Sequence, residues 1–420
     1  MILLARVTAL AGVHGDAGSR DPGMGVCDPN NCTRPYNHGQ RMITTARELY
    51  QQIQARRPPL LLDVRNEDEF ARWKVEGAHP VETLNLPYFA FVEDEPGSVA
   101  KVKDWLAGRA PELVVICAKG GSSEFVAEVL RGHSLSAQNL EGGMIAWGGQ
   151  TVRSEIPSSP VRVLQILRFG KGCLSYVLSA GSDAVIVDPH RHMDEYGALL
   201  HEHGLRLRAV IDTHLHADHV SGAPALAQSA SVPCFGHRDD FEHASFSFEP
   251  ITDRAPLRIG ALDLAPVRFL HSPGHTPGST SLLVNDKLLL TGDTLFVGGV
   301  GRPDLAGKAA EWGRELHRTL QERLRPLGDD VLVLPAHSAG PQEARADGTV
   351  AAPLGALRQR NPALRTDAAT FVEEAVRSAG AAPEAYARIR EANMGHWSAS
   401  EDELAELEFG KNECAMARRH

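Results

Sequence analysis

The chain has 420 residues, of which 43% are hydrophobic and 23% charged, and its net charge is −10. This length predicts two or three domains, and the composition is that of a globular protein with ample apolar residues for its cores. The acidic charge argues against nucleic acid or an acidic membrane as a partner, and no apolar run approaches the ~18 residues of a membrane-spanning helix. Six scattered cysteines favour the reducing cytoplasm over a disulfide framework.

Residues 1–41 are rich in Gly, Asp, Asn and Pro and have no apolar period, which predicts a loosely ordered extension. Arg6 interrupts the apolar start of this segment, and no small-residue cleavage site follows, so the pattern does not favour a secretory signal. Translation that begins at Met24 or Met42 would also account for the unusual start.

Residues 42–152 are predicted to form an α/β domain around a parallel sheet. Short continuous apolar runs such as Leu60–Val64 and Leu113–Cys117 are typical of buried parallel strands. Helical stretches such as Ser122–Leu130 separate these runs, and this alternation predicts a parallel sheet with helices on both faces. The Ser- and Pro-containing residues 151–160 are predicted to link this domain to the next.

Cys117 is the candidate catalytic residue of this first domain. It ends a predicted strand and is followed by the Gly-containing segment Ala118–Ser123, which opens the next helix. Unpaired backbone N–H groups, the positive end of the helix dipole and the charge of Lys119 would all favour the thiolate. The same cradle would hold the outer sulfur of a cysteine persulfide or an anion such as thiosulfate. The alternative is a buried strand cysteine without a chemical role.

The surroundings of Cys117 resemble a rhodanese, a sulfurtransferase domain, over about residues 42–150. The resemblance rests on LLDVR (61–65) and LEGGMIAW (140–147), among other segments. It implies sulfur transfer through a persulfide on Cys117, with sulfite or thiosulfate as a partner. Ser122 departs from the family, whose active loop often has Arg here. Turnover at this site and the direction of sulfur transfer therefore stay open.

Residues 161–345 show a different pattern, in which consecutive strands are joined by Gly-containing turns. Val161–Phe169, Cys173–Ala180 and Asp183–Asp188 predict an antiparallel meander. Further strands are predicted at Ala209–Asp212, Leu262–Leu270, Thr280–Val284, Lys287–Leu290 and Val331–Leu334. Residues 346–420 are predicted to be a mostly helical extension, and they carry no motif with an evident role.

Three loop segments of this second domain offer metal ligands, and each follows a strand-like run. They are THLHADH (213–219), SPGHTPG (272–278) and TGD (291–293). With one further histidine, the candidate ligands are His214, His216, Asp218, His219, His275, Asp293 and His337. Two imidazoles and one carboxylate with open positions fit a non-haem Fe(II) centre, whereas the full set fits a two-metal hydrolase. The residues alone leave both interpretations open.

These segments resemble the metallo-β-lactamase superfamily, an αββα sandwich with metal between the sheet edges, over about residues 161–345. The stretch TGDTLFVGGVGRPDL (291–305) makes the persulfide dioxygenase branch, which is related to glyoxalase II, the best match. This resemblance implies one Fe(II) per chain and oxidation of a thiol persulfide with O₂ to thiol and sulfite. The implied ligands are His214, His275 and Asp293. The residues implied to surround an empty second site are His216, Asp218, His219 and His337.

Four other positions bear on the substrate and on the site. Arg302 is a candidate catalytic residue that could grip a substrate carboxylate or sulfite, and its alternative role is a salt bridge with Asp304. Val300 stands where some dioxygenases of this branch have cysteine, so no protein sulfur is expected there. Cys173 and Cys234 are expected to be ordinary core cysteines.

The identity of the thiol carrier stays open, because the segment after His337 lacks the tyrosine that glutathione-using relatives place nearby. Glutathione or another low-molecular-weight thiol would fit, and a homo-oligomer is compatible with the sequence. The alternative function is a dinuclear zinc thioesterase of the glyoxalase II type. In that case the rhodanese-like part could be a non-catalytic binding module.

Overall fold

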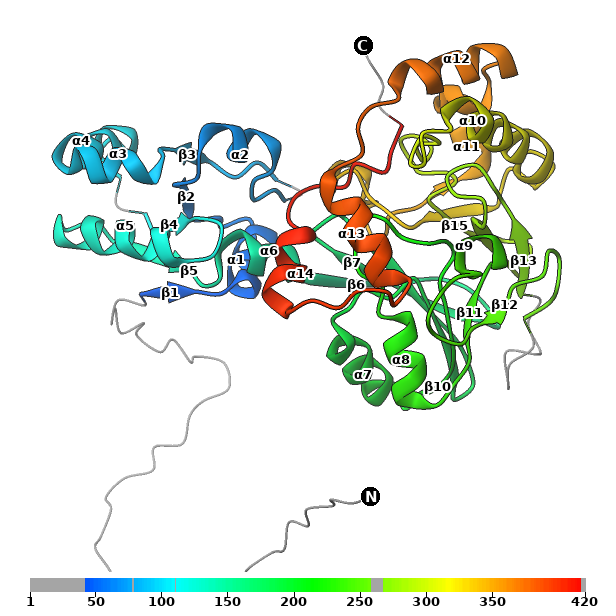
Figure 1. Ribbon diagram of the computed structural model, residues 1–420. Coiled ribbons are helices and arrows are strands. Elements are labelled where there is room, and N and C mark those ends of the chain that lie inside the picture. The colour runs from blue at the N-terminus through cyan, green and yellow to red at the C-terminus, as the bar shows by residue number, and fades with distance from the viewer. Residues whose placement is uncertain (1–41, 78, 110, 258–266, 417–420) are drawn as a thin grey trace, which may run out of the picture. The chain divides into compact units, whose positions relative to one another are not determined.

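The structure is a computed structural model that describes residues 42–416 apart from 78, 110 and 258–266 (Figure 1). By internal contacts the chain divides into residues 1–41 and residues 42–420. The extension predicted for residues 1–41 lies outside the described residues. Within the described ranges, no helix combines the length and hydropathy that a membrane span requires.

The first sheet is parallel throughout, and its strand order is β1-β5-β4-β2-β3. The strands are β1 (Ile43–Thr44), β2 (Leu60–Asp63), β3 (Thr83–Asn85), β4 (Leu113–Ile116) and β5 (Ala137–Leu140). The helices between and after them are α1 (Ala46–Gln54), α2 (Glu67–Arg72), α3 (Tyr88–Glu93), α4 (Glu95–Leu106), α5 (Gly121–Gly132) and α6 (Gly143–Gly149). The predicted α/β fold with a parallel sheet is therefore confirmed.

Alternate residues of the central strands face opposite sides of this sheet. Leu60 and Leu62 of β2 belong to the cluster that also contains Val126 of α5, whereas Leu61 packs with Leu49 of α1. Because side chains alternate along a strand, a continuous apolar run is the pattern expected when helices cover both faces.

The second sheet has seven strands in the order β12-β11-β10-β9-β8-β7-β6. They are β6 (Thr151–Ile156), β7 (Arg162–Arg168), β8 (Leu174–Ala180), β9 (Asp183–Val187), β10 (Arg206–Ile211), β11 (Cys234–Gly236) and β12 (Glu249–Pro250). The strands β7, β8 and β9 are antiparallel, as the predicted meander requires.

The predicted linker at residues 151–160 is wrong for its first half. Residues Thr151–Ile156 form β6, which pairs antiparallel with β7 along its whole length. Ile156 faces the core, while most of the strand is half-buried or exposed at the edge of the sheet. An edge strand tolerates the polar residues that we interpreted as a linker.

The third sheet has the order β13-β14-β15-β16-β17. Its strands are β13 (Val267–His271), β14 (Thr280–Val284), β15 (Leu288–Gly292), β16 (Leu332–Pro335) and β17 (Ala352–Pro353). The start of the strand predicted at Leu262–Leu270 lies outside the described residues. Asn285 and Asp286, which both have φ near +54°, make the tight turn between β14 and β15.

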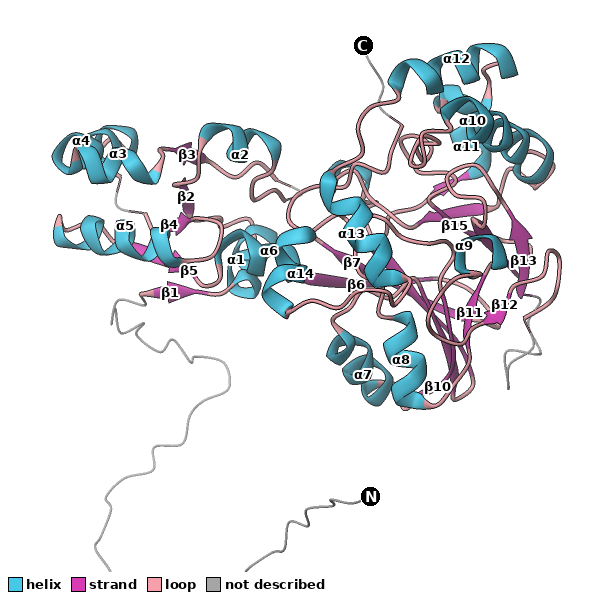
Figure 2. Cartoon of the chain, in the orientation of Figure 1, coloured by secondary structure: helices cyan, strands magenta, loops and turns pink. Residues whose placement is uncertain are grey.

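The second and third sheets pack face to face around one apolar core. This core joins Tyr176 and Val185 of the seven-stranded sheet to Leu282, Leu290 and Leu334 of the other sheet. On the outer face of the seven-stranded sheet lie α7 (Met193–Glu202) and α8 (Ala223–Ala230). On the other side lie α10 (Ala309–Arg318), α11 (Leu354–Arg360) and α12 (Ala368–Ser378), as Figure 2 shows. This arrangement is the predicted αββα sandwich.

The end of the chain is helical over much of its length. After α12 follow α13 (Glu384–Asn393) and α14 (Glu401–Leu407), and residues 408–416 continue without regular structure apart from isolated bridges. A backbone bridge pairs Ala415 with Gly301, and Arg302 donates its N–H to the carbonyl of Cys414 at 2.7 Å. The terminal segment therefore lies against the loop that follows β15.

Candidate metal centre and thiol site

The candidate metal ligands follow strands whose ends meet at one edge of the sandwich. Strand β14 is antiparallel to both β13 and β15, and β15 is parallel to β16. The strands β13, β15 and β16 therefore run in the same direction, and the segments carrying His275, Asp293 and His337 leave the sheet at the same edge. From the other sheet, β10 leads into the loop that carries His214 and the rest of its motif.

His214, His275 and Asp293 lie together, with one ligand atom from each within 4.8 Å of the others. His214 Nε2 and His275 Nε2 are 3.7 and 3.5 Å from Asp293 Oδ2. All three atoms are buried and have no hydrogen-bond partner. Because unpartnered buried polar atoms are costly, a cation at their centre would satisfy all three at once. The donor set therefore fits a divalent metal.

The outer nitrogens of both histidines are fixed by hydrogen bonds. His275 Nδ1 donates to the carbonyl of Arg302 at 3.0 Å. His214 Nδ1 donates to Thr213 Oγ1 at 2.9 Å, and Thr213 donates in turn to Asp188. Burial lowers the pKa of both His214 and His275, so both rings are neutral near pH 7. Each histidine is thus held in the tautomer that leaves Nε2 free for a metal.

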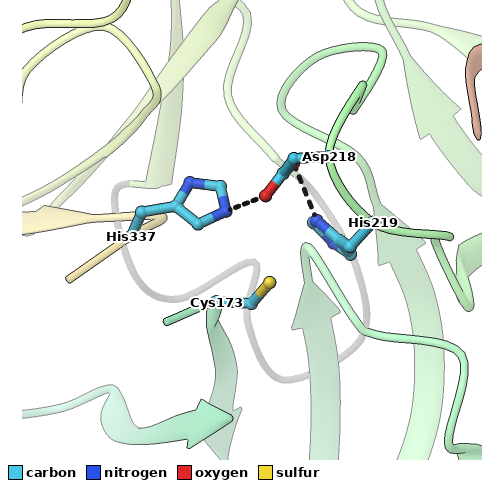
Figure 3. A group of neighbouring side chains, drawn as sticks. All are labelled: Cys173, Asp218, His219 and His337. Carbon is cyan, nitrogen blue, oxygen red and sulfur yellow. Dashed lines mark hydrogen bonds and ion pairs between the residues drawn. The ribbon is translucent and has the colours of Figure 1, made fainter. Parts of the chain in front are cut away.

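A second group consists of Cys173, Asp218, His219 and His337, all buried, with ligand atoms within 4.8 Å of one another (Figure 3). Asp218 contacts both histidines, at 2.9 Å from His337 Nε2 and 3.1 Å from His219 Nδ1. Cys173 was expected to be an ordinary core cysteine; it is buried as expected, and it also lies beside these three polar side chains. Burial raises its pKa, but His219 and Arg168 outweigh burial and lower the pKa to about 5.

His216 belongs to neither of these groups. Its Nε2 lies 3.2 Å from Asp188 Oδ1 and 3.7 Å from Asp212 Oδ1. Burial lowers the pKa of His216, but Asp188 and Asp212 raise it by more than burial lowers it, so the net shift is upward. His216 therefore supports Asp188, which also holds the Thr213 that orients His214.

Asp240, for which the sequence predicted no role, joins two of the ligand-bearing loops. It lies in the short helix α9 (Arg238–Phe241). Its carboxylate accepts hydrogen bonds from the backbone of Leu215 and Gly278, at 2.9 and 2.8 Å, and from Thr276 Oγ1 at 2.6 Å. This role of Asp240 could not be predicted from the sequence, because the residues that it contacts are far from it along the chain.

The C-terminal segment also supports the metal-binding loops. The sequence analysis did not predict this support. Asn393 Nδ2 donates to the carbonyls of His216 and His219, at 2.8 and 2.9 Å. Asn412 Nδ2 donates to Asp218 Oδ2 at 2.9 Å. Cys414, which is fully buried, packs with Ala217 and Tyr386 in one apolar cluster. This segment therefore covers the HxHxDH loop and excludes water from it.

Arg302 uses its side chain in a salt bridge. Its Nε and Nη2 donate to the two carboxylate oxygens of Asp304 at 2.6 and 2.8 Å, and Nη2 also donates to the carbonyl of Gly380. Of the two roles predicted for this residue, the structure shows the salt bridge. Its backbone carbonyl additionally orients His275. A contact of the guanidinium with substrate stays a prediction.

The Cys117 site is compact. Cys117 Sγ accepts hydrogen bonds from the backbone N–H of Gly120 and from Ser123 Oγ, both at 3.0 Å. Gly120, at φ +96°, precedes α5 as its N-cap. Gly143 packs so closely that a Cβ there would lie 2.3 Å from the Cys117 carbonyl. Lys119, which we predicted to favour the thiolate, forms an exposed ion pair with Glu406 instead of standing unpaired.

Family models match the two halves of the chain separately. Residues 45–150 match the rhodanese-like domain, and residues 168–337 match the metallo-beta-lactamase superfamily.

Known proteins of two activities are similar to the second half. A hydroxyacylglutathione hydrolase from Anaeromyxobacter dehalogenans is 36% identical over 51% of this chain and 91% of that protein. The mitochondrial persulfide dioxygenase ETHE1 from Bos taurus is 28% identical over 56% of this chain and 88% of that protein. A metallo-beta-lactamase from Staphylococcus aureus, known from a crystal structure, matches with a TM-score of 0.52 and 25% identity. The match covers 57% of this chain and 73% of that one.

Proposed function

We propose a sulfur-oxidising activity for this chain, which belongs to the metallo-β-lactamase superfamily and carries a rhodanese-like domain ahead of its metal-binding domain. The metal domain converts a thiol persulfide, O₂ and water into the free thiol, sulfite and two protons. The rhodanese-like domain moves sulfane sulfur through a persulfide on Cys117. The thiol is of low molecular weight, with glutathione as one candidate.

The observation that carries this proposal is the open three-ligand set of His214, His275 and Asp293. Its three unpartnered atoms match the two-histidine, one-carboxylate arrangement of non-haem iron centres. When bound there, Fe(II) supplies redox chemistry toward O₂ and persulfide sulfur at the positions that the three protein ligands leave open.

The residues around these ligands keep the site ordered and dry. Thr213 and the carbonyl of Arg302 orient the two imidazoles. Asp293 Oδ1 accepts a hydrogen bond from His337 Nδ1 at 2.6 Å, which leaves Oδ2 directed at the two histidines. A fixed and buried ligand set favours one metal geometry and limits side reactions with water.

The Cys117 site supports the second half of the proposal. The N–H of Gly120 and the hydroxyl of Ser123 stabilise negative charge on the sulfur, and therefore also an attached sulfane sulfur. Sulfite made in one domain is an acceptor for sulfane sulfur in the other, and the product of that transfer is thiosulfate. A covalent tether raises the local concentration of this shared intermediate.

A second candidate function is a dinuclear thioesterase of the glyoxalase II type. Sequence similarity supports both activities, since a hydroxyacylglutathione hydrolase and a persulfide dioxygenase both match. The nearby group of Asp218, His219 and His337 favours this alternative, because it offers ligands for a second ion.

Metal analysis combined with oxygen uptake separates the two functions. We expect one iron per chain, with O₂ consumption and sulfite release when a small-molecule persulfide is added. An enzyme that carries only zinc, cleaves a glutathione thioester and leaves O₂ unchanged would contradict the proposal.

A further inference from the structure

We propose that a small cavity between the rhodanese-like domain and the metal-binding domain binds one small sulfur oxyanion, sulfite or thiosulfate. Arg168, Arg191 and His192 line this cavity, together with the carboxylate of Glu408. We call it the junction cavity. The identity of the anion rests on the proposed function, whereas the presence of an anion site does not.

The junction cavity is formed by elements that pack directly on one another. Gly148 of α6 and Gly170 after β7 both line it, and Gly170 donates its N–H to the carbonyl of Gly148 at 2.7 Å. Trp73 and Phe409 line it too, and their rings make an edge-on contact with centroids 5.4 Å apart. The cavity therefore lies within a packed contact between the two domains.

One wall of the junction cavity is attached to the thiol site. Met144 and Ile145 of α6 line the cavity. Their backbone N–H groups donate to the carbonyls of Cys117 and Ala118, at 2.9 and 3.1 Å. These two hydrogen bonds join the cavity wall to the loop that carries the sulfur.

Another wall is attached to the metal-binding loops. Arg168 Nη2 donates to Cys173 Sγ at 3.7 Å, and Cys173 lies beside His219. Glu408 Oε1 accepts from the backbone N–H of Val220, the residue after His219, at 2.7 Å. The residues that line the cavity therefore connect it to both chemical sites by direct contacts.

The buried charge around the cavity is positive. Glu408 Oε2 accepts from Arg168 Nη1 and Arg191 Nε, at 2.7 and 3.1 Å, so two guanidinium groups share one buried carboxylate. The second partner of Arg191 is Glu401, which is 80% exposed, so water and salt screen its charge. The same positive field acts on His192, because burial and both arginines lower its pKa to about 4. This excess of positive charge favours an anion.

One donor of the cavity lining lacks a partner. Arg168 is 2% exposed, and its Nε is buried without a hydrogen-bond partner among the described residues. A buried N–H group in this state is costly, and an oxyanion that accepts from it would remove the cost. His192 is neutral near pH 7 and can donate one ring N–H to the same anion.

The size of the cavity selects small ligands. Its volume is about 60 Å³, and one water molecule needs about 10–15 Å³ of such space. One compact oxyanion therefore fits, whereas a molecule as large as glutathione does not. Sulfite and thiosulfate are the compact anions that the proposed reactions make.

A holding site for these anions suits the proposed transfer between the domains. In that step the sulfur lone pair of sulfite attacks the outer sulfur of the Cys117 persulfide. A new S–S bond forms in thiosulfate, the S–S bond to Cys117 breaks, and its electron pair stays on Cys117 as the thiolate. Sulfite that is held close to both sites reaches Cys117 at a higher local concentration than free sulfite does. The Glu408 carboxylate limits the affinity, so the anion can leave.

Calorimetric titration of the full-length protein with sulfite tests the site, in a Cys117→Ser background that excludes reaction with a persulfide. Arg191→Gln should weaken sulfite binding by about tenfold or more, because it removes a charged donor. Glu408→Gln should instead tighten binding, because both arginines lose their competing carboxylate. Arg153→Gln removes an arginine whose ion pairs lie outside the cavity, and this control should bind sulfite as before. Affinities that move in the same direction in Arg191→Gln and Glu408→Gln, or that do not move, would overturn the proposal.

Selenate shows where the anion binds, because it is a compact oxyanion and selenium gives an anomalous X-ray signal. Crystals of the wild-type protein soaked in selenate should show a selenium peak between Arg168 and Arg191. Peaks only at the metal centre or on the protein surface would overturn the proposal. Neither measurement depends on oxygen uptake, so failure here leaves the proposed function untouched. A protein that binds selenate in the cavity but consumes no oxygen would keep the anion site and lose only the assignment to sulfite.

Discussion

The thiol site and the metal centre of this chain are built in different ways. The groups that contact Cys117 Sγ come from the loop that follows it and the first turn of α5. The metal centre combines loops from two sheets with supports such as Asp240 and Asn393, which are far away in the sequence. A local site can be changed without affecting the rest of the fold, whereas a distributed site depends on the packing of the whole domain.

The largest expected effect comes from Asp293→Ala, which removes a ligand and the acceptor of His337. We expect persulfide-dependent oxygen uptake to fall by more than about 100-fold, since even the loss of an outer partner costs ~10–100-fold. Oxygen uptake and thiosulfate-dependent sulfur transfer are measured on the same preparation. Sulfur transfer that falls equally would show that the two sites are not independent.

Cys117→Ser should have the opposite effect to Asp293→Ala on the two activities. A hydroxyl cannot carry sulfane sulfur as a persulfide, so we expect sulfur transfer to fall to background while oxygen uptake on a small-molecule persulfide is unchanged. Cys234→Ser serves as the matched control for the loss of a buried cysteine. Full transfer activity in Cys117→Ser would leave the rhodanese-like domain with a binding role only.

Glu408→Gln tests how far the stability of the fold depends on the end of the chain. Glu408 is buried, pairs with Arg168 and Arg191, and accepts from the backbone of Val220 at 2.7 Å. Removing one partner from a buried ion pair costs about 3–5 kcal/mol, and the lost charge should lower the free energy of unfolding by roughly that amount. Chemical denaturation of the metal-free protein measures the loss.

The lowered pKa of Glu408 predicts that the stability of the protein depends on pH. Burial raises the pKa of Glu408, but Arg168 and Arg191 outweigh this effect and lower it to about 2, from 4.5 for an exposed glutamate. The stabilisation is therefore complete above pH 4.5 and is lost as the pH falls toward 2. Glu408→Gln should flatten this part of the unfolding profile, and an unchanged slope would contradict the assignment.

The smallest expected effect is that of Asn393→Ala. The change leaves two buried carbonyls of the HxHxDH loop without a donor, which costs about 1–3 kcal/mol. We expect weaker metal retention during dialysis against a chelator, with sulfur transfer at Cys117 unaffected. Equal metal retention in the variant and the wild type would show that the loop is ordered without this support.

The same contrast explains what could be predicted from the sequence. The apolar runs, the loop after Leu113–Ile116 and the ligand-rich segments are local patterns, so the parallel sheet, the antiparallel strands and the candidate ligands could be predicted from them. The αββα sandwich was predicted from the family resemblance that these segments carry. Cys173 and Asp240 could not be assigned in this way, because their partners lie far away in the chain. Thr151–Ile156 was misjudged because an edge strand and a linker have similar compositions.

The contacts of Asn393, Asn412 and Cys414 have a consequence for how the protein is made. The HxHxDH loop leaves the ribosome well before these residues are synthesised, so its supports at Asn393 and Asn412 are added last. The rhodanese-like fold, whose sheet ends at Leu140, can form while translation continues. The nascent chain can therefore complete the Cys117 site before the metal-binding HxHxDH loop has its last supports.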